Sequence, residues 1–486
     1  MNYTEIGVFI VYLLAMLSIG IYFYFKERGG SEKTYFLGGR TMGPWVSALS
    51  AGASDMSAWV LMGLPTSVYA LGMNQIWIPI GLAIGYALSW ILEAPRLRRF
   101  SIVAGDSITI PQYLTNRFLS RSKSLQVVCA AVFLFAYTIY AASSIKACGT
   151  LFNTVTGIDE KLAMQIASAV IISYTFLGGY SAVCWTDFFQ GMLILGAMLL
   201  APICGAFVLA GGGSVSAAAE PGYWNAFSDV REIISGLAWG IGYFGMPHII
   251  IRFMSLKSQR ELKKSAVIGI SWTVLIVIFA VLIGVIGRRM LGFDEEINSG
   301  SLVFIVMVRR MFPPLLSGIL LSAVLSASMS TADSQLLAAS SSFASDVYQS
   351  VIRKNRGSSG EMMFVSRVVV IAVSLIAYFI ARAPGSGSIM DMVSNAWGVF
   401  GAAFGPVIML SLYWKKLSFS GAVAGIAVGA ISDIIWCYTL SFTGIYEILP
   451  ASILGLLSAL IVSKFSRQPS AEVQELFDRA VAYTED

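Results

Sequence analysis

Long apolar runs, separated by short polar stretches, recur along the whole chain of 486 residues. A helix needs about 20 predominantly apolar residues to cross the hydrocarbon core of a bilayer. Windows of that length predict an all-α polytopic membrane protein with thirteen transmembrane helices. The predicted spans cover residues 5–25, 41–66, 72–94, 126–150, 161–182, 185–210, 230–252, 265–287, 313–343, 363–382, 389–413, 418–440 and 447–466.

The second predicted span is interrupted by a carboxylate and several small residues. Residues 51–65 read AGASDMSAWVLMGLP, in which Gly52, Ser54 and Ser57 flank Asp55. A carboxylate at membrane depth costs about 2.5–3.5 kcal/mol on insertion scales and persists mainly where it faces a protein-lined cavity. Small neighbours let the helix unwind, which turns backbone carbonyls toward a cation. The alternative is a buried aspartate that is tied to neighbouring helices without any ligand.

A similar interruption occurs five spans later, where residues 236–247 read GLAWGIGYFGMP. Segments broken by Gly and Pro at matching positions of two halves indicate a transporter binding site. Because five spans separate them, the halves would insert with opposite polarity, as an inverted five-plus-five repeat. The predicted divisions are a first helix with its inner loop (1–40), the two five-helix repeats (41–210 and 211–413), two peripheral helices (414–466) and a cytoplasmic tail with a short amphipathic helix (467–486).

Charge predicts the orientation of these spans. With the N-terminus outside, 24 of the 32 Lys and Arg residues fall on the inner side, seven fall outside, and Lys146 lies within a span. Cytoplasmic loops carry such an excess of Lys and Arg. We therefore expect a multi-pass protein of the cell inner membrane with its N-terminus outside and its C-terminus in the cytoplasm.

Hydroxyl groups line one face of the ninth span. Ala327, Ser330, Thr331 and Ser334 stand at i, i+3, i+4 and i+7. Hard cations prefer several oxygen ligands, and these hydroxyls with the carbonyls of an unwound helix would supply them to sodium. Ser and Ala are also common where membrane helices pack tightly, so the span taken alone supports either interpretation.

Aromatic residues follow one face of the seventh span, with Trp239, Tyr243 and Pro247 at i, i+4 and i+8. Such residues commonly pack or form interfacial belts. Here they lie on the broken segment, which favours a pocket that Tyr140 of the fourth span would join. An aromatic wall with a phenolic hydroxyl suits a small, partly apolar solute, and its ring faces attract cationic amines.

Further carboxylates lie near the predicted inner side. Asp187 lies between the fifth and sixth spans, and Asp333 neighbours Ser334 in the ninth. Together they would form a release path or a second site for a cation. For Asp187 the alternative is a cap at the N-terminus of the sixth span.

Several kinds of chemistry lack their residues. The chain has one histidine, His248, and five cysteines without a CxxC pair, which disfavours a metal cluster, a disulfide framework and a nucleophile–base pair. It contains no GxxxxGK[ST] loop for ATP. We therefore expect a protein that is not an enzyme, uses no organic cofactor and binds no nucleic acid.

Six stretches together resemble the sodium/solute symporters over nearly the whole chain. They are YFLGGR (35–40), ASDMSAW (53–59), LGGYSAVCWTDFFQG (177–191), AWGIGYFGMPHI (238–249), MSTADSQLL (329–337) and GAVAGIAVG (421–429). Within that family, the chain is most similar to bacterial sodium/proline symporters, mainly through Ser57, Tyr140 and the Trp239–Tyr243–Pro247 triplet.

The resemblance implies a site for each transported species. The sodium ligands would be the carbonyls of Ala53, Met56 and Ala327 with the hydroxyls of Ser330 and Thr331, supported by Asp55. The proline pocket would be lined by Ser57, Tyr140, Trp239, Tyr243 and Pro247. Some relatives couple a second sodium through hydroxyls near Ser334 and the equivalent of Asp187. Here Asp333 takes one of those hydroxyl positions, which puts a second ion in doubt.

The resulting expectation is sodium-coupled symport of L-proline into the cell by alternating access. Its partners would be the solute, sodium and the bilayer, and a monomer would suffice. Another small solute (a different amino acid, a carboxylate, a sugar or a vitamin) remains open, as does a transporter-like sensor or a channel.

Overall fold

The computed structural model describes residues 2–26, 32–175, 179–212, 222–354 and 356–484. Parts of the sequence predictions lie outside them, namely Leu177 and Gly178 of the stretch 177–191, residues 213–221 of the second predicted repeat and the last two residues of the predicted tail. The elements are α1 (Tyr3–Lys26), α2 (Glu32–Leu37), η1 (Gly38–Arg40), α3 (Pro44–Asp55), η2 (Trp59–Gly63), α4 (Leu64–Leu71), η3 (Met73–Ile76), α5 (Trp77–Leu88), η4 (Ser89–Glu93), α6 (Ala94–Val103), α7 (Ile110–Arg117), α8 (Ser124–Thr156), α9 (Glu160–Thr175), α10 (Tyr180–Ala210), α11 (Val230–Ala238), η5 (Trp239–Phe244), α12 (Pro247–Ser255), α13 (Gln259–Leu291), α14 (Glu295–Ser299), α15 (Val303–Met311), α16 (Pro314–Ser341), η6 (Ser342–Ile352), α17 (Ser359–Ala381), α18 (Ile389–Tyr413), α19 (Phe419–Thr439), η7 (Ser441–Thr443), α20 (Ile448–Phe465) and α21 (Ala471–Ala482).

The all-helical class agrees with the sequence prediction, but thirteen separate spans are not reproduced. Among the described residues, ten helices are long and apolar enough to cross a membrane, and a pair bent by 44° at residues 230–255 makes an eleventh. The predicted span 41–66 is divided between α3 and α4, and the predicted span 161–182 corresponds to α9, of 16 residues. The first is therefore helical but broken, and the described part of the second is helical as well.

The predicted interruptions are present in the structure, and local sequence explains both. The α3 helix ends at Asp55, where Met56 leaves the helical region at φ −78° and ψ 69°, and a wide π-turn follows over residues 59–63. In the second segment, the helical pattern changes at Trp239, and Met246 is extended before Pro247 starts α12. Proline fits the first turn of a helix, where no N–H partner is needed.

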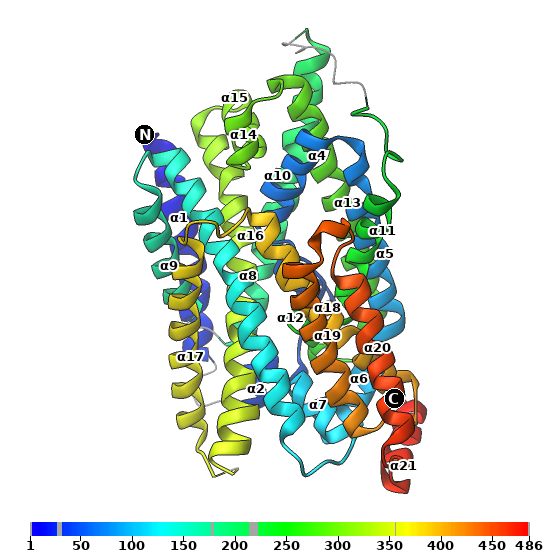
Figure 1. The fold of residues 1–486 in the computed structure, drawn as a ribbon. Coiled ribbons are helices and arrows are strands. Elements are labelled where there is room, and N and C mark those ends of the chain that lie inside the picture. The colour runs from blue at the N-terminus through cyan, green and yellow to red at the C-terminus, as the bar shows by residue number, and fades with distance from the viewer. Residues whose placement is uncertain (1, 27–31, 176–178, 213–221, 355, 485–486) are drawn as a thin grey trace.

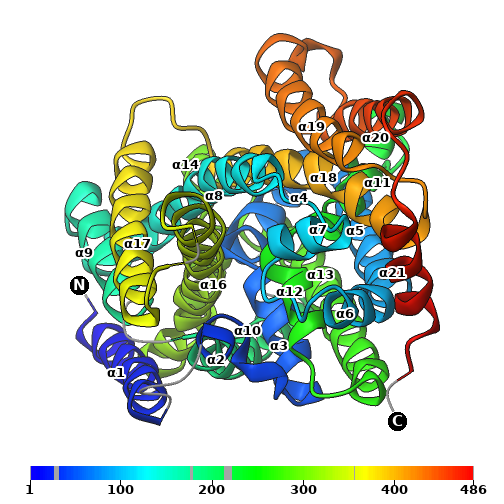
Figure 2. The same cartoon turned by 90° about the horizontal axis from the view of Figure 1, so that it is seen from below.

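Figure 2 shows α3, α12 and α16 near the middle of the molecule, with α1, α9 and α17 at one edge and α19 and α20 at the opposite one. The α3 helix packs on α10, α12, α13 and α16. The two chain ends lie toward opposite ends of the molecule in Figure 1. The predicted tail helix is present as α21, which buries Phe477 against Phe100 of α6 with 5.2 Å between ring centroids. The core thus sits where the broken helices cross.

Candidate functional site

The broken end of α3 meets α16 at a single hydroxyl group. Ser330 Oγ donates to the carbonyl of Ala53 at 2.8 Å and lies 3.3 Å from the carbonyl of Ala327 on its own helix. Thr331 Oγ1 is buried with no hydrogen-bond partner in the part of the chain that the structure describes. Met56, the fifth residue of the predicted sodium set, is fully buried at the α3 C-cap. All five residues thus belong to two elements in contact.

Asp55 links the two broken helices. Its side chain is fully buried, and its Oδ2 accepts a hydrogen bond from the Tyr243 hydroxyl at 2.5 Å. The Tyr140 hydroxyl lies 3.4 Å from the backbone carbonyl of Asp55. Two residues of the predicted solute pocket therefore converge on the residue that ends α3. Since a membrane carboxylate needs such partners, this contact also explains how Asp55 is accommodated.

Aromatic rings surround the contact between Asp55 and Tyr243, and we call this region the aromatic junction. Trp239 stacks on Tyr446 at 5.0 Å and lies 6.3 Å from Trp59, while Tyr243 meets Trp397 edge-on at 5.0 Å. The Trp397 indole also donates to the carbonyl of Trp239 at 2.8 Å. The predicted set held Trp239 and Tyr243 but missed these three neighbours. Trp59 had a signal, because it ends the ASDMSAW stretch, whereas no local pattern indicates Trp397 or Tyr446.

Two further predicted pocket residues lie at the breaks themselves. Ser57 follows the end of α3 and is 1% exposed, and Pro247 is the first residue of α12 and is buried. The neighbouring His248 packs rather than faces solvent. Its Nε2 lies 3.2 Å from the carbonyl of Ser54, and its backbone N–H donates to the Tyr137 hydroxyl at 2.9 Å. His248 thus connects the start of α12 to α3 and α8.

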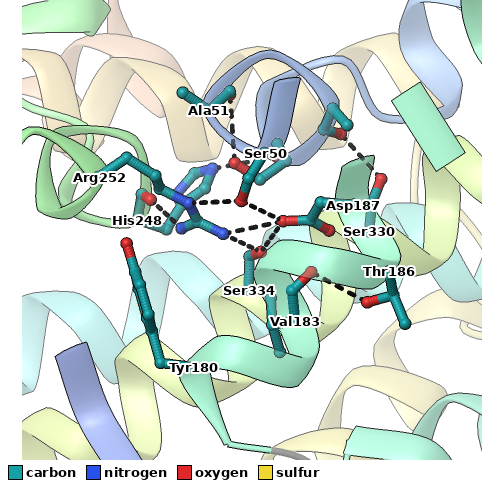
Figure 3. Close-up of polar contacts among 12 residues, drawn as sticks. Ser50, Ala51, Tyr180, Val183, Thr186, Asp187, His248, Arg252, Ser330 and Ser334 are labelled. Atoms are coloured by element: carbon teal, nitrogen blue, oxygen red, sulfur yellow. Dashed lines mark hydrogen bonds and ion pairs between the residues drawn. The ribbon is translucent and has the colours of Figure 1, made fainter. Parts of the chain in front are cut away.

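Arg252 forms a buried polar cluster with residues of both halves of the chain (Figure 3). Its guanidinium lies 3.1 Å from Asp187 Oδ2 and donates to Ser334 Oγ at 2.6 Å and to Ser50 Oγ at 3.1 Å. Ser50 in turn donates to Asp187 at 2.6 Å. The third guanidinium nitrogen, Nη1, donates to the carbonyl of His248. We call Ser50, Asp187, Arg252 and Ser334 the arginine cluster; it joins α3, α10, α12 and α16.

This cluster changes two sequence interpretations. Asp187 lies seven residues inside α10 and is fully buried, so it does not cap that helix. Arg252, counted as an inner-loop cation, lies within α12 and is 1% exposed. The structure brings Asp187 and Ser334 together, as the second cation path requires. Asp333 is also fully buried. Asp55 is not part of the arginine cluster, because its side chain bonds to Tyr243 in the aromatic junction.

Arg40 connects the segment after α6 to the end of α12. Its Nε lies 3.0 Å from Asp106 Oδ1, and its other nitrogens donate to the carbonyls of Ser107 and Met254, the latter near the end of α12. Lys33 also pairs with Asp106. Burial opposes ionisation of Asp106, but the hydrogen bond from Lys33 and the charge of Arg40 outweigh it and lower the pKa of this carboxyl. The loops at 38–40 and 104–109 are thereby tied to the second broken helix.

Three comparisons bear on this arrangement. The model of the sodium:solute symporter family matches residues 35–429. The chain is 42% identical over 474 residues to the high-affinity proline transporter PutP of Bacillus subtilis, covering 95% of this chain and 98% of that protein. It is 40% identical over 478 residues to a sodium/proline symporter of Staphylococcus aureus, covering 96% and 93%. Among solved structures, a substrate-bound Na⁺-coupled sialic acid symporter matches with a TM-score of 0.77 and 22% identity over 96% of this chain and 99% of that one, which is a likeness of fold.

Proposed function

The chain belongs to the sodium:solute symporter family, and from that premise we propose that it is a secondary active transporter that carries L-proline into the cell together with sodium. The observation that carries the proposal is the contact between the broken end of α3 and the hydroxyl face of α16, directly beside the aromatic junction. Relatives named as proline transporters, similar over nearly their whole length, support proline as the solute.

Sodium would bind at the carbonyls of Ala53, Met56 and Ala327 with the hydroxyls of Ser330 and Thr331. The chemistry of this donor set suits a hard monovalent cation, because every ligand is a neutral oxygen. The buried Thr331 hydroxyl supports the assignment, since a polar atom without a hydrogen-bond partner in a membrane core is costly unless a ligand satisfies it.

Proline would occupy the space that Ser57, Tyr140, Trp239, Tyr243 and Pro247 line. Its pyrrolidine ring is apolar and its ammonium group is cationic, so indole and phenol faces suit both parts. The Asp55–Tyr243 hydrogen bond would transmit the presence of sodium to this pocket, because it joins the helix that holds the ion to the helix that holds the solute.

Alternating access would require the two broken helices to move relative to the helices that pack on them. On this proposal, residues 41–210 and 211–413 form the inverted repeats, and the arginine cluster closes the cytoplasmic side by joining elements of both. Because Asp187 is paired with a guanidinium in this arrangement, it is available to a cation only after Arg252 moves away.

The test of the function is uptake of radiolabelled solutes into proteoliposomes. An inward sodium gradient should drive accumulation of proline, whereas choline buffer should not. A panel of another amino acid, a carboxylate, a sugar and a vitamin decides the solute class. Equal accumulation in both buffers would contradict sodium coupling, and non-saturating flux without accumulation would indicate a channel.

The sodium site makes a sharper prediction. Substituting Ser330→Ala and Thr331→Ala removes two of five ligands, so the sodium concentration for half-maximal uptake should rise at least about tenfold, since each lost hydroxyl ligand is worth about 1 kcal/mol or more. Ser326→Ala, one turn earlier on α16, is the matched control, because its hydroxyl donates to the carbonyl of Ser322 on its own helix and is not among the five proposed ligands. Unchanged sodium activation in the double variant would refute the site.

The orientation is also a proposal, with the N-terminus outside and α21 in the cytoplasm. A cysteine introduced at the exposed Ser470, in a variant without native cysteines, should react with a membrane-impermeant maleimide in inside-out vesicles. In right-side-out vesicles the same cysteine should stay unlabelled. The reverse pattern would invert the topology.

A further inference from the structure

An apolar groove runs between η5, α18 and α20. It holds a cavity of about 380 Å³. Its lining residues are Ile241, Phe244, Gly405, Pro406, Met409, Leu410, Tyr413, Leu449, Ser452, Ile453 and Leu456. Ile453 and Tyr413 are 49% and 45% exposed, so the groove opens to the surface that the bilayer covers. Its dimensions and lining suit a hydrocarbon chain.

A second cavity of about 560 Å³ lies at the end of the same two helices, next to the start of α21. It is lined by Trp414, Lys416, Leu460, Ser463, Lys464, Gln468 and Gln474. Two lining side chains are cationic and none is anionic. The cavity therefore attracts an anion while it keeps an apolar wall.

The two cavities form one continuous surface. Along α20 their lining residues include positions 449, 453, 456, 460 and 464, which stand at i, i+4, i+7, i+11 and i+15 and so share one helical face. Leu456 and Leu460 are four residues apart, about 6 Å along the axis. On α18, Tyr413 of the first cavity is followed directly by Trp414 of the second. The groove thus passes from an apolar middle to a basic end.

The two lysines of the basic end are exposed and paired with no described carboxylate, since neither forms a salt bridge within the part of the chain that the structure describes. Their neighbour Lys415 differs, because it pairs with Asp478 of α21. Basic pockets between membrane helices at the cytoplasmic side suit anionic lipid headgroups, and tryptophan is common at headgroup level. A different groove between α5 and α13, of about 400 Å³, is lined by apolar residues alone and lacks such an end.

We propose that α18, α20 and the start of α21 bind one anionic phospholipid of the leaflet on the C-terminal side, with an acyl chain in the groove and the phosphate between Lys416 and Lys464. This site includes none of the proposed sodium or proline residues, although Ile241 and Phe244 of its groove belong to the same η5 segment as Tyr243. It would hold the two peripheral helices against α18, whose Trp397 contacts the solute pocket.

The experiment is native mass spectrometry of the full chain in detergent, titrated with dioleoylphosphatidylglycerol. The wild type should retain one tightly bound lipid. Substituting Lys416→Gln and Lys464→Gln should weaken retention about 20- to 30-fold, because each lysine near an anionic headgroup contributes about fivefold. Ile453→Trp, which fills the groove without a change of charge, should weaken it as well. Lys415→Gln is the matched control and should retain the lipid.

Other results would overturn the proposal. If Lys415→Gln lowers lipid retention as much as the double variant does, retention depends on the overall positive charge of this surface and not on a specific site. If phosphatidylcholine, which has no net charge, binds as tightly as dioleoylphosphatidylglycerol, the two lysines do not select an anionic headgroup. If sn-glycerol 3-phosphate or inorganic phosphate displaces the lipid at equal concentration, the site binds free phosphate. A Lys416→Arg, Lys464→Arg variant should restore binding, which separates lost charge from lost folding, and monodisperse elution must accompany every variant.

Discussion

At the scale of single residues, the arginine cluster shows how charged side chains are stabilised inside the helical bundle. Arg252 and Asp187 are 1% and 0% exposed, and the hydroxyls of Ser50 and Ser334 bond to the guanidinium and to Asp187 Oδ2. Taking either ion out of water is expensive, so the pair persists because geometry and hydrogen bonds compensate it. Removal of one partner would leave the other charge buried and unpaired.

The prediction at this scale concerns stability. Arg252→Gln should lower the free energy of unfolding by about 3–5 kcal/mol, because it isolates the Asp187 carboxylate. Adding Asp187→Asn should recover part of that loss, as a double-mutant cycle would show. Thermal unfolding in detergent measures both. Arg231→Gln, which breaks an exposed pair with Asp229, should change little. Additive losses in the double variant would contradict the coupling.

At the scale of elements, close crossings of helices fix where the broken segments lie. Gly81 and Gly85 of α5 face Gly236 and Gly240 of the second broken segment. A Cβ atom on Gly85 would stand 2.2 Å from the carbonyl oxygen of Gly240. Backbone cannot yield as a flexible side chain does, so only glycine fits there.

Gly85→Ala should therefore separate α5 from η5 and lower stability by about 1–3 kcal/mol, as overpacking does. The expected result is less monodisperse protein in the membrane fraction, measured by fluorescence-detected size exclusion. Gly196→Ala is the control, because a Cβ there meets nothing within 4 Å. Equal yields of the two variants would show that the crossing tolerates a methyl group.

The elements also show what the sequence can and cannot predict. The hydrophobic windows correctly predicted the ten long helices, because the length of an apolar run is a local property of the sequence. The positions of Gly, Pro and Asp55 correctly predicted both interruptions, because residues that break a helix also act locally. Helical spacing, which is also local, indicated the hydroxyl face of α16 and the aromatic face of η5, whereas the carbonyls of Ala53 and Met56 were implied by the family resemblance. Arg252 as the partner of Asp187, and Trp397 beside Tyr243, were not predicted. Those contacts join segments 65 and 154 residues apart, so only the packing of the fold creates them.

At the scale of the whole molecule, ion and solute would share one pair of helices rather than two independent sites. Asp55 ends the helix that provides Ala53, and Tyr243 belongs to the solute pocket. A ligand shifts a conformational equilibrium only by its difference in affinity for the two states. Both ligands would therefore favour the same closed arrangement.

Such coupling must be reciprocal. If sodium tightens proline binding by some factor, proline must tighten sodium binding by the same factor. Scintillation-proximity titrations of the purified protein with labelled proline at several sodium concentrations, and with labelled sodium at several proline concentrations, should give equal factors, each expected at about 5- to 150-fold. Unequal factors at equilibrium would mean that the two titrations report different sites.

The pairing of Arg252 with Asp187 has an electrical consequence. While the guanidinium stays paired with Asp187, that carboxylate is balanced without a second mobile ion. Zwitterionic proline adds no net charge, so transport with one sodium ion per proline would move one positive charge inward in each turnover. A voltage of 100 mV contributes about 2.3 kcal/mol to that step, which corresponds to a concentration ratio of about fifty from voltage alone.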